Sequence, residues 1–189
     1  MDPYEKCPVY KTEHFLLRQV KLKDATDLLE CYRNPTAAVR ACWSNCSYDH
    51  WPQTKREMQA ILRMWRREYR QRVYVRWSVI DKRSKAAVGT IEMCGGFGFF
   101  PDATGGELRA DLAEPYETQL YLSELLQLAT ERFYSLFGAN FIAINGGPEE
   151  GPRLRAIAAA GFAPYDWSLA VNHWPAPDAK DYYGRKLSM

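Results

Sequence analysis

The chain has 189 residues, of which 47% are hydrophobic and 25% are charged, and its formal net charge is +2. This size and composition allow a hydrophobic core to form and argue against disorder and two full domains, and the small net charge argues against a general attraction to nucleic acid or membranes. The five cysteines, an odd number at irregular spacing, favour reduced thiols over a disulfide framework.

Two amphipathic helices are predicted in the first half of the chain. The segment from Asp24 to Arg33 has its apolar residues on one side, and Pro35 lies just beyond its end. Thr54 begins the second helix, whose apolar residues repeat at helical spacing: Met58, Ile61, Leu62 and Trp65. Each helix therefore has one side suited to packing against the rest of the domain.

The second helix and the residues after it are rich in arginine. The basic residues are Arg63, Arg66, Arg67, Arg70, Arg72 and Arg76, and the aromatic residues Trp65, Tyr69 and Tyr74 lie between them. A basic stripe with interleaved aromatics is typical of single-strand nucleic-acid binding. Glu57 and Glu68 interrupt the stripe, however, and charges opposite an apolar side are the ordinary amphipathic pattern. We therefore favour a solvated helix face and predict no nucleic-acid partner.

The segment 105–162 has the pattern strand, helix, strand, helix. Gly106–Leu112 leads into a run with helical apolar spacing, and the short apolar run Phe141–Ile144 follows it. After a connection rich in glycine and proline, a last helix is predicted over Arg153–Ala160, with Gly161 at its C-cap.

Several other functions lack their motifs. The glycine-rich segment Gly95–Gly98 does not lead into a helix, so we interpret it as a flexible turn after the third strand and not as a dinucleotide-binding loop. There is no phosphate-binding Gly-x-x-x-x-Gly-Lys-Ser/Thr loop, and no histidine lies beside a serine or cysteine in a nucleophile motif. Cys42 and Cys46 are not joined by further ligands at zinc spacing, so we predict no metal site.

This order of elements resembles the Gcn5-related N-acetyltransferase (GNAT) fold, in the branch that includes ribosomal-protein N-terminal acetyltransferases. Residues 12–20 and 24–29 look like the opening strand and first helix of that branch, 77–82 and 88–91 look like its central hairpin, and 181–187 look like its last strand. The match covers roughly residues 12 to 165 in order. It implies an α+β GNAT fold, with a mixed, mostly antiparallel central sheet that is splayed near its centre and flanked by helices on both faces. We expect one GNAT-like domain over residues 1–189.

The resemblance also implies acetyl-CoA as co-substrate, yet the coenzyme-binding motif is altered. Family members hold the pyrophosphate with a Gln/Arg-x-x-Gly-x-Gly/Ala turn, whose backbone N–H groups meet the anion at a helix N-terminus. The aligned positions here are Glu117, Leu120 and Leu122, so an acid repels the ligand and two side chains crowd its approach. The implied cofactor contacts nevertheless fall on this turn, at Glu117, Thr118, Gln119, Leu120, Tyr121 and Leu122.

A second family signature, Asn-x-x-Ser-x-Arg before the final helix, is altered as well. Glu150 and Arg153 occupy its first positions, and only Arg155 survives, which makes Arg155 the remaining implied cofactor contact. An inserted loop could let Asn145 supply an equivalent polar group. These departures leave open an alternative function, a GNAT-like binding or regulatory module that has lost efficient coenzyme A binding.

The implied chemistry is direct attack of a primary amine on the thioester, with no covalent intermediate. In the family a backbone N–H near the position of Leu112 binds the carbonyl oxygen. Glu107 and Asp111 lie four apart on the same predicted strand and therefore on one face, where either could accept the amine proton, or where both are ordinary surface acids. Many members protonate the thiolate with a tyrosine at the position of Ile157. Of the remaining tyrosines, Tyr165, Tyr182 and Tyr183, we take Tyr183 as the candidate acid, although each also suits a core position.

The loop between the first two helices shapes the acceptor pocket in this family. Tyr48, His50 and Trp51 are the implied acceptor-binding residues, through polar contacts and a cation–π wall, with a packed surface loop as the alternative. The acceptor is expected to be an amine on a small molecule, an amino acid or a peptide N-terminus. The arginine-rich helix borders this region in the family, so an acidic acceptor is a third interpretation of its charges.

The expected location is cytoplasmic, because the chain has no N-terminal apolar signal stretch and no apolar run of about 18 residues. We expect no membrane partner. Exposed strands or aromatic residues leave room for a homodimer.

Overall fold

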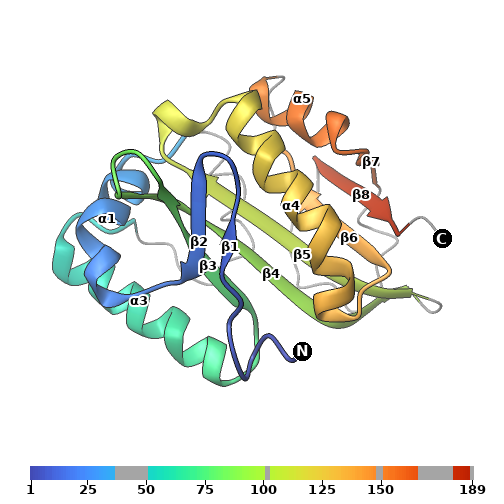
Figure 1. Ribbon diagram of the computed structural model, residues 1–189, viewed down its shortest axis with the longest axis horizontal. Helices are drawn as coiled ribbons and strands as arrows, with labels where there is room; N and C mark the ends of the chain where they lie inside the picture. Colours follow the sequence, from blue (N-terminus) through green and yellow to red (C-terminus); the bar gives the residue numbers. More distant parts are fainter. Residues whose placement is uncertain (37–50, 101–102, 148–150, 166–180, 188–189) are drawn as a thin grey trace.

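The computed structural model describes residues 1–36, 51–100, 103–147, 151–165 and 181–187 (Figure 1). The strands are β1 (Tyr10–Lys11), β2 (Phe15–Gln19), β3 (Val75–Asp81), β4 (Ala87–Phe100), β5 (Ala103–Leu112), β6 (Phe141–Asn145), β7 (Ala163–Pro164) and β8 (Tyr182–Lys186). The helices are α1 (Ala25–Arg33), α3 (Lys55–Arg70), α4 (Gln119–Phe137) and α5 (Pro152–Ala159), with short 3-10 helices η1 (Leu22–Asp24) and η3 (Glu114–Tyr116).

The strands form one mixed sheet in the order β1-β2-β3-β4-β5-β6-β8-β7. Every neighbouring pair is antiparallel except β5 and β6, which run parallel. Helices α4 and α5 lie across one face, as Figure 1 shows, and α1 and α3 pack on the other. The predicted fold class, a mostly antiparallel sheet with helices on both faces, is confirmed.

Each face of the sheet has its own core. Under α4, the ring of Trp77 stacks on Phe133 with 5.0 Å between the ring centroids. Under α1 and α3, the ring of Tyr32 meets Trp65 edge-on at 5.6 Å. Aromatic pairs of this kind combine a large buried apolar area with a preferred geometry. Strand β3 contributes to both cores, because nearly all of its residues are buried.

The helix boundaries follow local signals in the sequence. Thr54 caps α3: its side chain accepts a hydrogen bond from the Glu57 backbone N–H, and the Glu57 carboxylate accepts one from the Thr54 N–H. Beyond the end of α5, Gly161 adopts a φ of +79°, a left-handed conformation that favours glycine. The predicted start of α3 and the predicted glycine after α5 are thus confirmed. None of the helices in the described ranges is long and apolar enough to cross a membrane.

The predicted turn at Gly95–Gly98 is wrong, because these residues belong to β4. Gly95 pairs with Gly106 and Phe97 with Gly105, and the register between β4 and β5 shifts on either side of Phe97. A Cβ added to Gly106 would lie 2.7 Å from the backbone oxygen of Cys94, so the strand has no room for a side chain there. The glycines mark irregular pairing and close packing within a strand, which a glycine-rich sequence does not distinguish from a turn.

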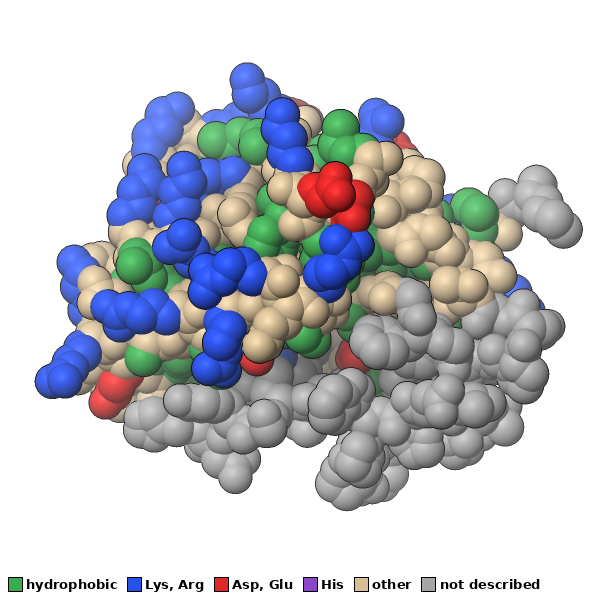
Figure 2. All heavy atoms as spheres, turned by 90° about the horizontal axis from the view of Figure 1, so that it is seen from below, with side chains coloured by type: hydrophobic (Ala, Val, Ile, Leu, Met, Phe, Trp, Pro, Cys, Tyr) green, Lys and Arg blue, Asp and Glu red, His purple; other side chains and the backbone are tan. Residues whose placement is uncertain are grey.

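The arginine-rich segment divides into an exposed part and a buried part. Arg63, Arg66, Arg67 and Arg70 are exposed on α3, and Figure 2 shows Lys and Arg side chains gathered over this part of the molecule. Trp65 faces inward and is 3% exposed. Arg76 does not continue the stripe, as the sequence suggested, because the helix has ended and β3 turns this side chain into the protein, where it is 4% exposed. The solvated basic face is therefore formed by α3 and by Arg72 just beyond its end, and it does not include Arg76.

Candidate active site

An opening in the sheet lies between β5 and β6. Among the described residues, the parallel pairing ends with Leu108 opposite Ile144, whereas β5 continues to Leu112. On its other side the strand remains paired with β4, and the Ala113 N–H donates to the Val88 carbonyl oxygen at 2.9 Å. Because N–H groups alternate between the two edges of a strand, the Leu112 N–H points toward the opening. This is the donor predicted to bind the carbonyl oxygen, and that role stays a prediction.

Helix α4 begins beside this opening with a capped first turn. The Thr118 side-chain oxygen accepts from the Tyr121 N–H at 3.4 Å, and its carbonyl oxygen accepts from the Leu122 N–H at 3.0 Å. For the N–H groups of Gln119 and Leu120 the described part of the chain provides no acceptor. Two donors at a helix N-terminus, where the helix dipole is positive, form a site suited to an anion.

The two leucines of the altered motif point in different directions. Leu120 is 61% exposed, so its side chain extends into solvent beside the first turn of α4. Leu122 is 1% exposed and belongs to the core beneath α4. The prediction that both leucines crowd the ligand is therefore wrong for Leu122, because helical geometry turns that position inward.

Glu117, the acid in the altered pyrophosphate-binding turn, is neutralised by Arg153, a base in the second altered motif. The Arg153 guanidinium donates from Nε and Nη2 to the two carboxylate oxygens of Glu117, at 2.6 and 2.9 Å. Both side chains are nearly buried, at 5% and 11% exposed. Arg155 donates to the Gln119 side-chain oxygen at 3.1 Å, which brings a second guanidinium to the start of α4. The repulsion expected from Glu117 is thus offset locally.

The two candidate acids lie on the α1 and α3 face of β5, as the alternation of a strand predicts. The intervening residues of β5 face the opposite core, beneath α4: Leu108, Ala110 and Leu112. Asp111 is fully buried, and both of its carboxylate oxygens accept from Arg109 Nε, at 3.0 and 2.9 Å. The Tyr32 hydroxyl also donates to Asp111, at 2.9 Å. Neither acid is an ordinary surface residue, since Glu107 is half-buried.

Asp111 belongs to a larger buried network centred on Arg76. This guanidinium donates to Glu92 at 2.6 Å, approaches Asp111 at 3.7 Å and lies 4.0 Å above the ring of Trp65. Burial tends to raise the pKa of Asp111, but Arg109 and Arg76 outweigh it and hold that pKa below its usual value. Asp111 is also fully buried, whereas Glu107 is partly exposed, which leaves Glu107 as the stronger candidate for a base.

Glu107 has a partner that the sequence prediction did not choose. The Tyr182 hydroxyl donates to Glu107 Oε1 at 2.9 Å. Tyr183 pairs with Ile144 and packs with the core beneath α4 and α5, so it faces the other side of the sheet. Ile157 is fully buried in that same core. The role of Tyr183 as the thiolate acid stays a prediction, but this tyrosine does not share a face with Glu107 and Asp111.

The structure describes only part of the implied acceptor loop. Tyr48 and His50 lie outside the described residues, as do Cys42 and Cys46. Trp51 is partly buried and packs against the core of α1 and α3. Its role in acceptor binding stays a prediction.

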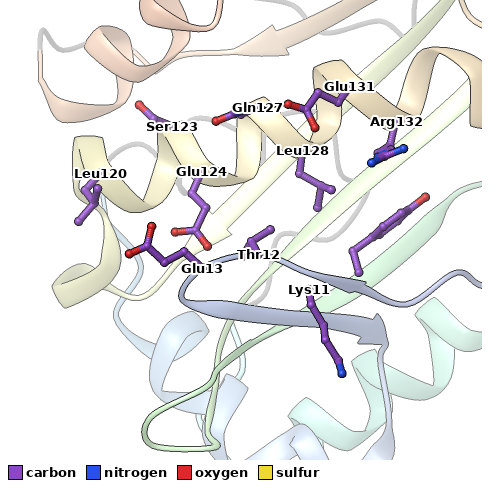
Figure 3. A pocket seen from close by; sticks show the side chains of 11 residues that line it. Lys11, Thr12, Glu13, Leu120, Ser123, Glu124, Gln127, Leu128, Glu131 and Arg132 are labelled. Atoms are coloured by element: carbon purple, nitrogen blue, oxygen red, sulfur yellow. Dashed lines mark hydrogen bonds between the residues drawn. The ribbon is translucent and has the colours of Figure 1, made fainter.

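A groove of about 570 Å³ runs along the outer side of α4 (Figure 3). Its lining residues come from α4, from β1 and from the segment that joins β1 and β2: Tyr10, Lys11, Thr12, Glu13, Leu120, Ser123, Glu124, Gln127, Leu128, Glu131 and Arg132. Glu124 is fixed at the wall of the groove, because its two carboxylate oxygens bond the backbone N–H of His14 at 2.8 Å and the ring Nδ1 of His14 at 2.6 Å.

This pairing gives a pH-dependent prediction. The hydrogen bond to Glu124 is the main reason that the pKa of His14 is raised above its usual value. A raised histidine pKa stabilises the fold below the unfolded pKa, and that contribution is lost as the pH rises through the folded pKa. We expect Glu124→Gln to lower the titration midpoint of His14 toward about 6.5, as measured by NMR of the imidazole protons.

Glu13→Gln is the matched control, because Glu13 lies 3.9 Å from the other ring nitrogen of His14 and its side chain is 83% exposed. It should change the midpoint much less. Equal shifts in both variants would contradict the special role of Glu124.

Comparison with known proteins identifies relatives of this fold. A family model described as an acetyltransferase (GNAT) domain matches residues 14–163. A structure from Vibrio cholerae, named as a ribosomal-protein-serine acetyltransferase, has 15% identity and a TM-score of 0.70, and the alignment covers 99% of this chain and 100% of that one. A ribosomal-protein-S5-alanine acetyltransferase from Vibrio fischeri has 15% identity and a TM-score of 0.63, with coverages of 83% and 84%.

A third similar structure is a spermidine N-acetyltransferase chimera of Vibrio cholerae SpeG and hSSAT. It has 12% identity and a TM-score of 0.58, with 82% of this chain and 83% of that chain covered. At such identities the likeness concerns the fold. No curated protein matches the chain.

Proposed function

Because the chain belongs to the GNAT acetyltransferase family, we propose that it transfers the acetyl group of acetyl-CoA to a primary amine on a small molecule, an amino acid or a protein N-terminus. The observation that carries this proposal is the position of the α4 N-terminus beside the opened edge of β5. The α4 N-terminus supplies N–H donors for an anion, and the edge of β5 supplies an N–H donor for a carbonyl oxygen. The similar structures include a ribosomal-protein-S5-alanine acetyltransferase and a spermidine N-acetyltransferase chimera, so the proposed acceptor class stays broad.

The residues around the α4 N-terminus fit the coenzyme. The N–H groups of Gln119 and Leu120 suit a pyrophosphate, Arg153 neutralises Glu117, and Arg155 adds positive charge at the same place. The exposed side chain of Leu120 would lie at the rim of this site. We infer that the altered motif retains its anion-binding function, with Arg155 of α5 in place of the basic residue of the turn.

When bound, acetyl-CoA supplies a thioester whose carbonyl carbon bonds to the amine nitrogen as the carbon–sulfur bond breaks. The Leu112 N–H would stabilise the negative charge that develops on the carbonyl oxygen. Glu107 would take the proton that the amine loses. Tyr183 is the predicted donor of a proton to the departing thiolate.

Cys94 lies opposite Glu107 on β4 and is not a nucleophile in this proposal. Burial, followed by the negative charge of Glu107, raises the pKa of the Cys94 thiol. The group is therefore a thiol and not a thiolate at neutral pH. Direct attack by the amine needs no acyl-cysteine.

The proposal is tested by calorimetric titration with acetyl-CoA. We expect micromolar binding to the unmodified protein and at least a tenfold loss in Leu120→Glu, roughly the effect of removing one charge-assisted contact. A carboxylate at this exposed position repels a pyrophosphate, yet it is favourable for the N-terminus of α4, so the variant should fold. Leu120→Gln is the matched neutral control and should bind like the unmodified protein.

The alternative function is a GNAT-shaped binding or regulatory module. It is favoured by the buried pair of Glu117 and Arg153, because the carboxylate already takes up guanidinium donors beside the turn. Under this alternative, neither the unmodified protein nor Leu120→Gln would bind acetyl-CoA at millimolar concentration.

A further inference from the structure

Tyr182 reaches Glu107 across an intervening strand. The order of strands here is β5, β6, β8, and Tyr182 on β8 is directly opposite Asn145 on β6. Glu107 on β5 is opposite Ala143. The phenol therefore crosses β6 diagonally, over the small side chain of Ala143, to donate to Glu107 Oε1 at 2.9 Å.

The tyrosine is a rigid donor. Tyr182 is 2% exposed, and its strand is hydrogen-bonded to β6 on one side and β7 on the other. A glutamate side chain is flexible, and ordering it costs conformational entropy unless a neighbour restricts it. A hydrogen bond from a fixed phenol restricts the carboxylate and favours its charged form.

We propose that Tyr182 is a positioning residue, which holds the Glu107 carboxylate in the orientation that removes the amine proton. This inference rests on the proposed acetyltransferase function. The phenol keeps its own proton throughout and donates to Oε1, while the proton from the amine goes to Oε2. The hydrogen bond would be strongest while Glu107 is charged, which is the state that accepts the proton.

The first experiment compares Tyr182→Phe with the unmodified protein in acetyl transfer to the best acceptor from a panel of primary amines. We expect kcat to fall about tenfold with KM little changed, because a loosely held base has lost orientation and not substrate contact. The acid limb of the pH–rate profile should move to higher pH, since the carboxylate is protonated more easily without its donor.

Tyr134→Phe is the matched control. This tyrosine is also buried, and its hydroxyl also donates to β8, at 2.8 Å to the Arg185 carbonyl oxygen, but it lies on α4, under the other face of the sheet. Its removal should cost comparable stability without moving kcat or the pH profile. Equal losses of kcat in the two variants would overturn the proposal.

A double variant separates positioning from general support of the fold. If Tyr182 acts through Glu107, Tyr182→Phe should cause almost no further loss in a Glu107→Gln background. A full tenfold loss in that background would mean that Tyr182 acts independently, and the proposal would be wrong.

A final measurement does not depend on catalysis. The ¹³C carboxyl resonance of Glu107, assigned with Glu107→Gln, should titrate about one pH unit higher in Tyr182→Phe than in the unmodified protein. If no amine is acetylated, the proposed function fails, and this titration still decides the role of Tyr182. An unchanged titration midpoint of Glu107 in Tyr182→Phe would overturn the proposed role of Tyr182.

Discussion

Arg76→Met should lower the free energy of unfolding by about 3–5 kcal/mol, as measured by urea denaturation at neutral pH. The guanidinium is 4% exposed and is hydrogen-bonded to Glu92, with Asp111 at 3.7 Å. Methionine fills similar space, but it has no charge. The carboxylates of Glu92 and Asp111 then stay in a buried region without the positive charge of Arg76. The cost comes from the uncompensated charge more than from lost packing.

Two variants make the origin of this effect testable. Arg66→Met removes an exposed guanidinium from α3 and should change stability little. Adding Glu92→Leu to Arg76→Met removes the carboxylate left behind and should recover part of the loss. If the second substitution gave further destabilisation of similar size, charge compensation would not explain the role of Arg76.

Glu107→Gln should lower kcat for acetyl transfer by roughly 10²–10⁴-fold, with little change in KM. Glutamine has the same shape and can still accept a hydrogen bond from Tyr182 through its side-chain oxygen, so the fold should be preserved. What is lost is the ability to take a proton from the amine. Steady-state kinetics with varied amine concentration, together with a thermal melt of each protein, measure both effects.

Asp111→Asn provides the contrast. Asp111 accepts from Arg109 and Tyr32 and is fully buried, so its substitution should reduce stability first and activity only as a consequence. Activity that survives Glu107→Gln but is lost in well-folded Asp111→Asn would reverse the assignment of the base.

The elements that frame the site could be predicted from the sequence, because they depend on neighbouring residues. Thr54 and Glu57 form a capping box within one turn of α3, and Gly161 lies in the left-handed conformation after α5. The placement of Glu107 and Asp111 on one face of β5 needed only the alternation of a strand. The position of the anion-binding turn needed the family resemblance as well.

The contacts within the site could not be predicted, because they depend on strand register. Tyr182 and Tyr183 are adjacent in sequence and face opposite sides of the sheet, and only the pairing of β8 with β6 shows which of them reaches Glu107. Arg76 looked like part of a basic stripe for the same reason: nothing local indicates that β3 turns it toward Glu92.

One signal in the sequence could have revealed the Glu117–Arg153 pair. Both positions depart from the family motifs, and they do so with opposite charges: an acid replaces a basic or amide residue, and a base replaces a serine. Opposite departures at two sites that flank one ligand indicate an ion pair between them. The structure shows that pair.

The early end of the β5–β6 pairing has a consequence for how the sheet meets its surroundings. Among the strands that the structure describes, the outermost are β1 and β7, each only two residues long, and such short strands give a foreign chain little to pair with. The open edge over Arg109–Leu112, by contrast, is internal, with β4 beside it and helices on both faces. The unpaired backbone groups of β5 can therefore form hydrogen bonds with a thin, extended molecule that enters the opening. Because these groups lie inside the sheet and not at its outer edge, they do not present another protein chain with a strand on which to aggregate.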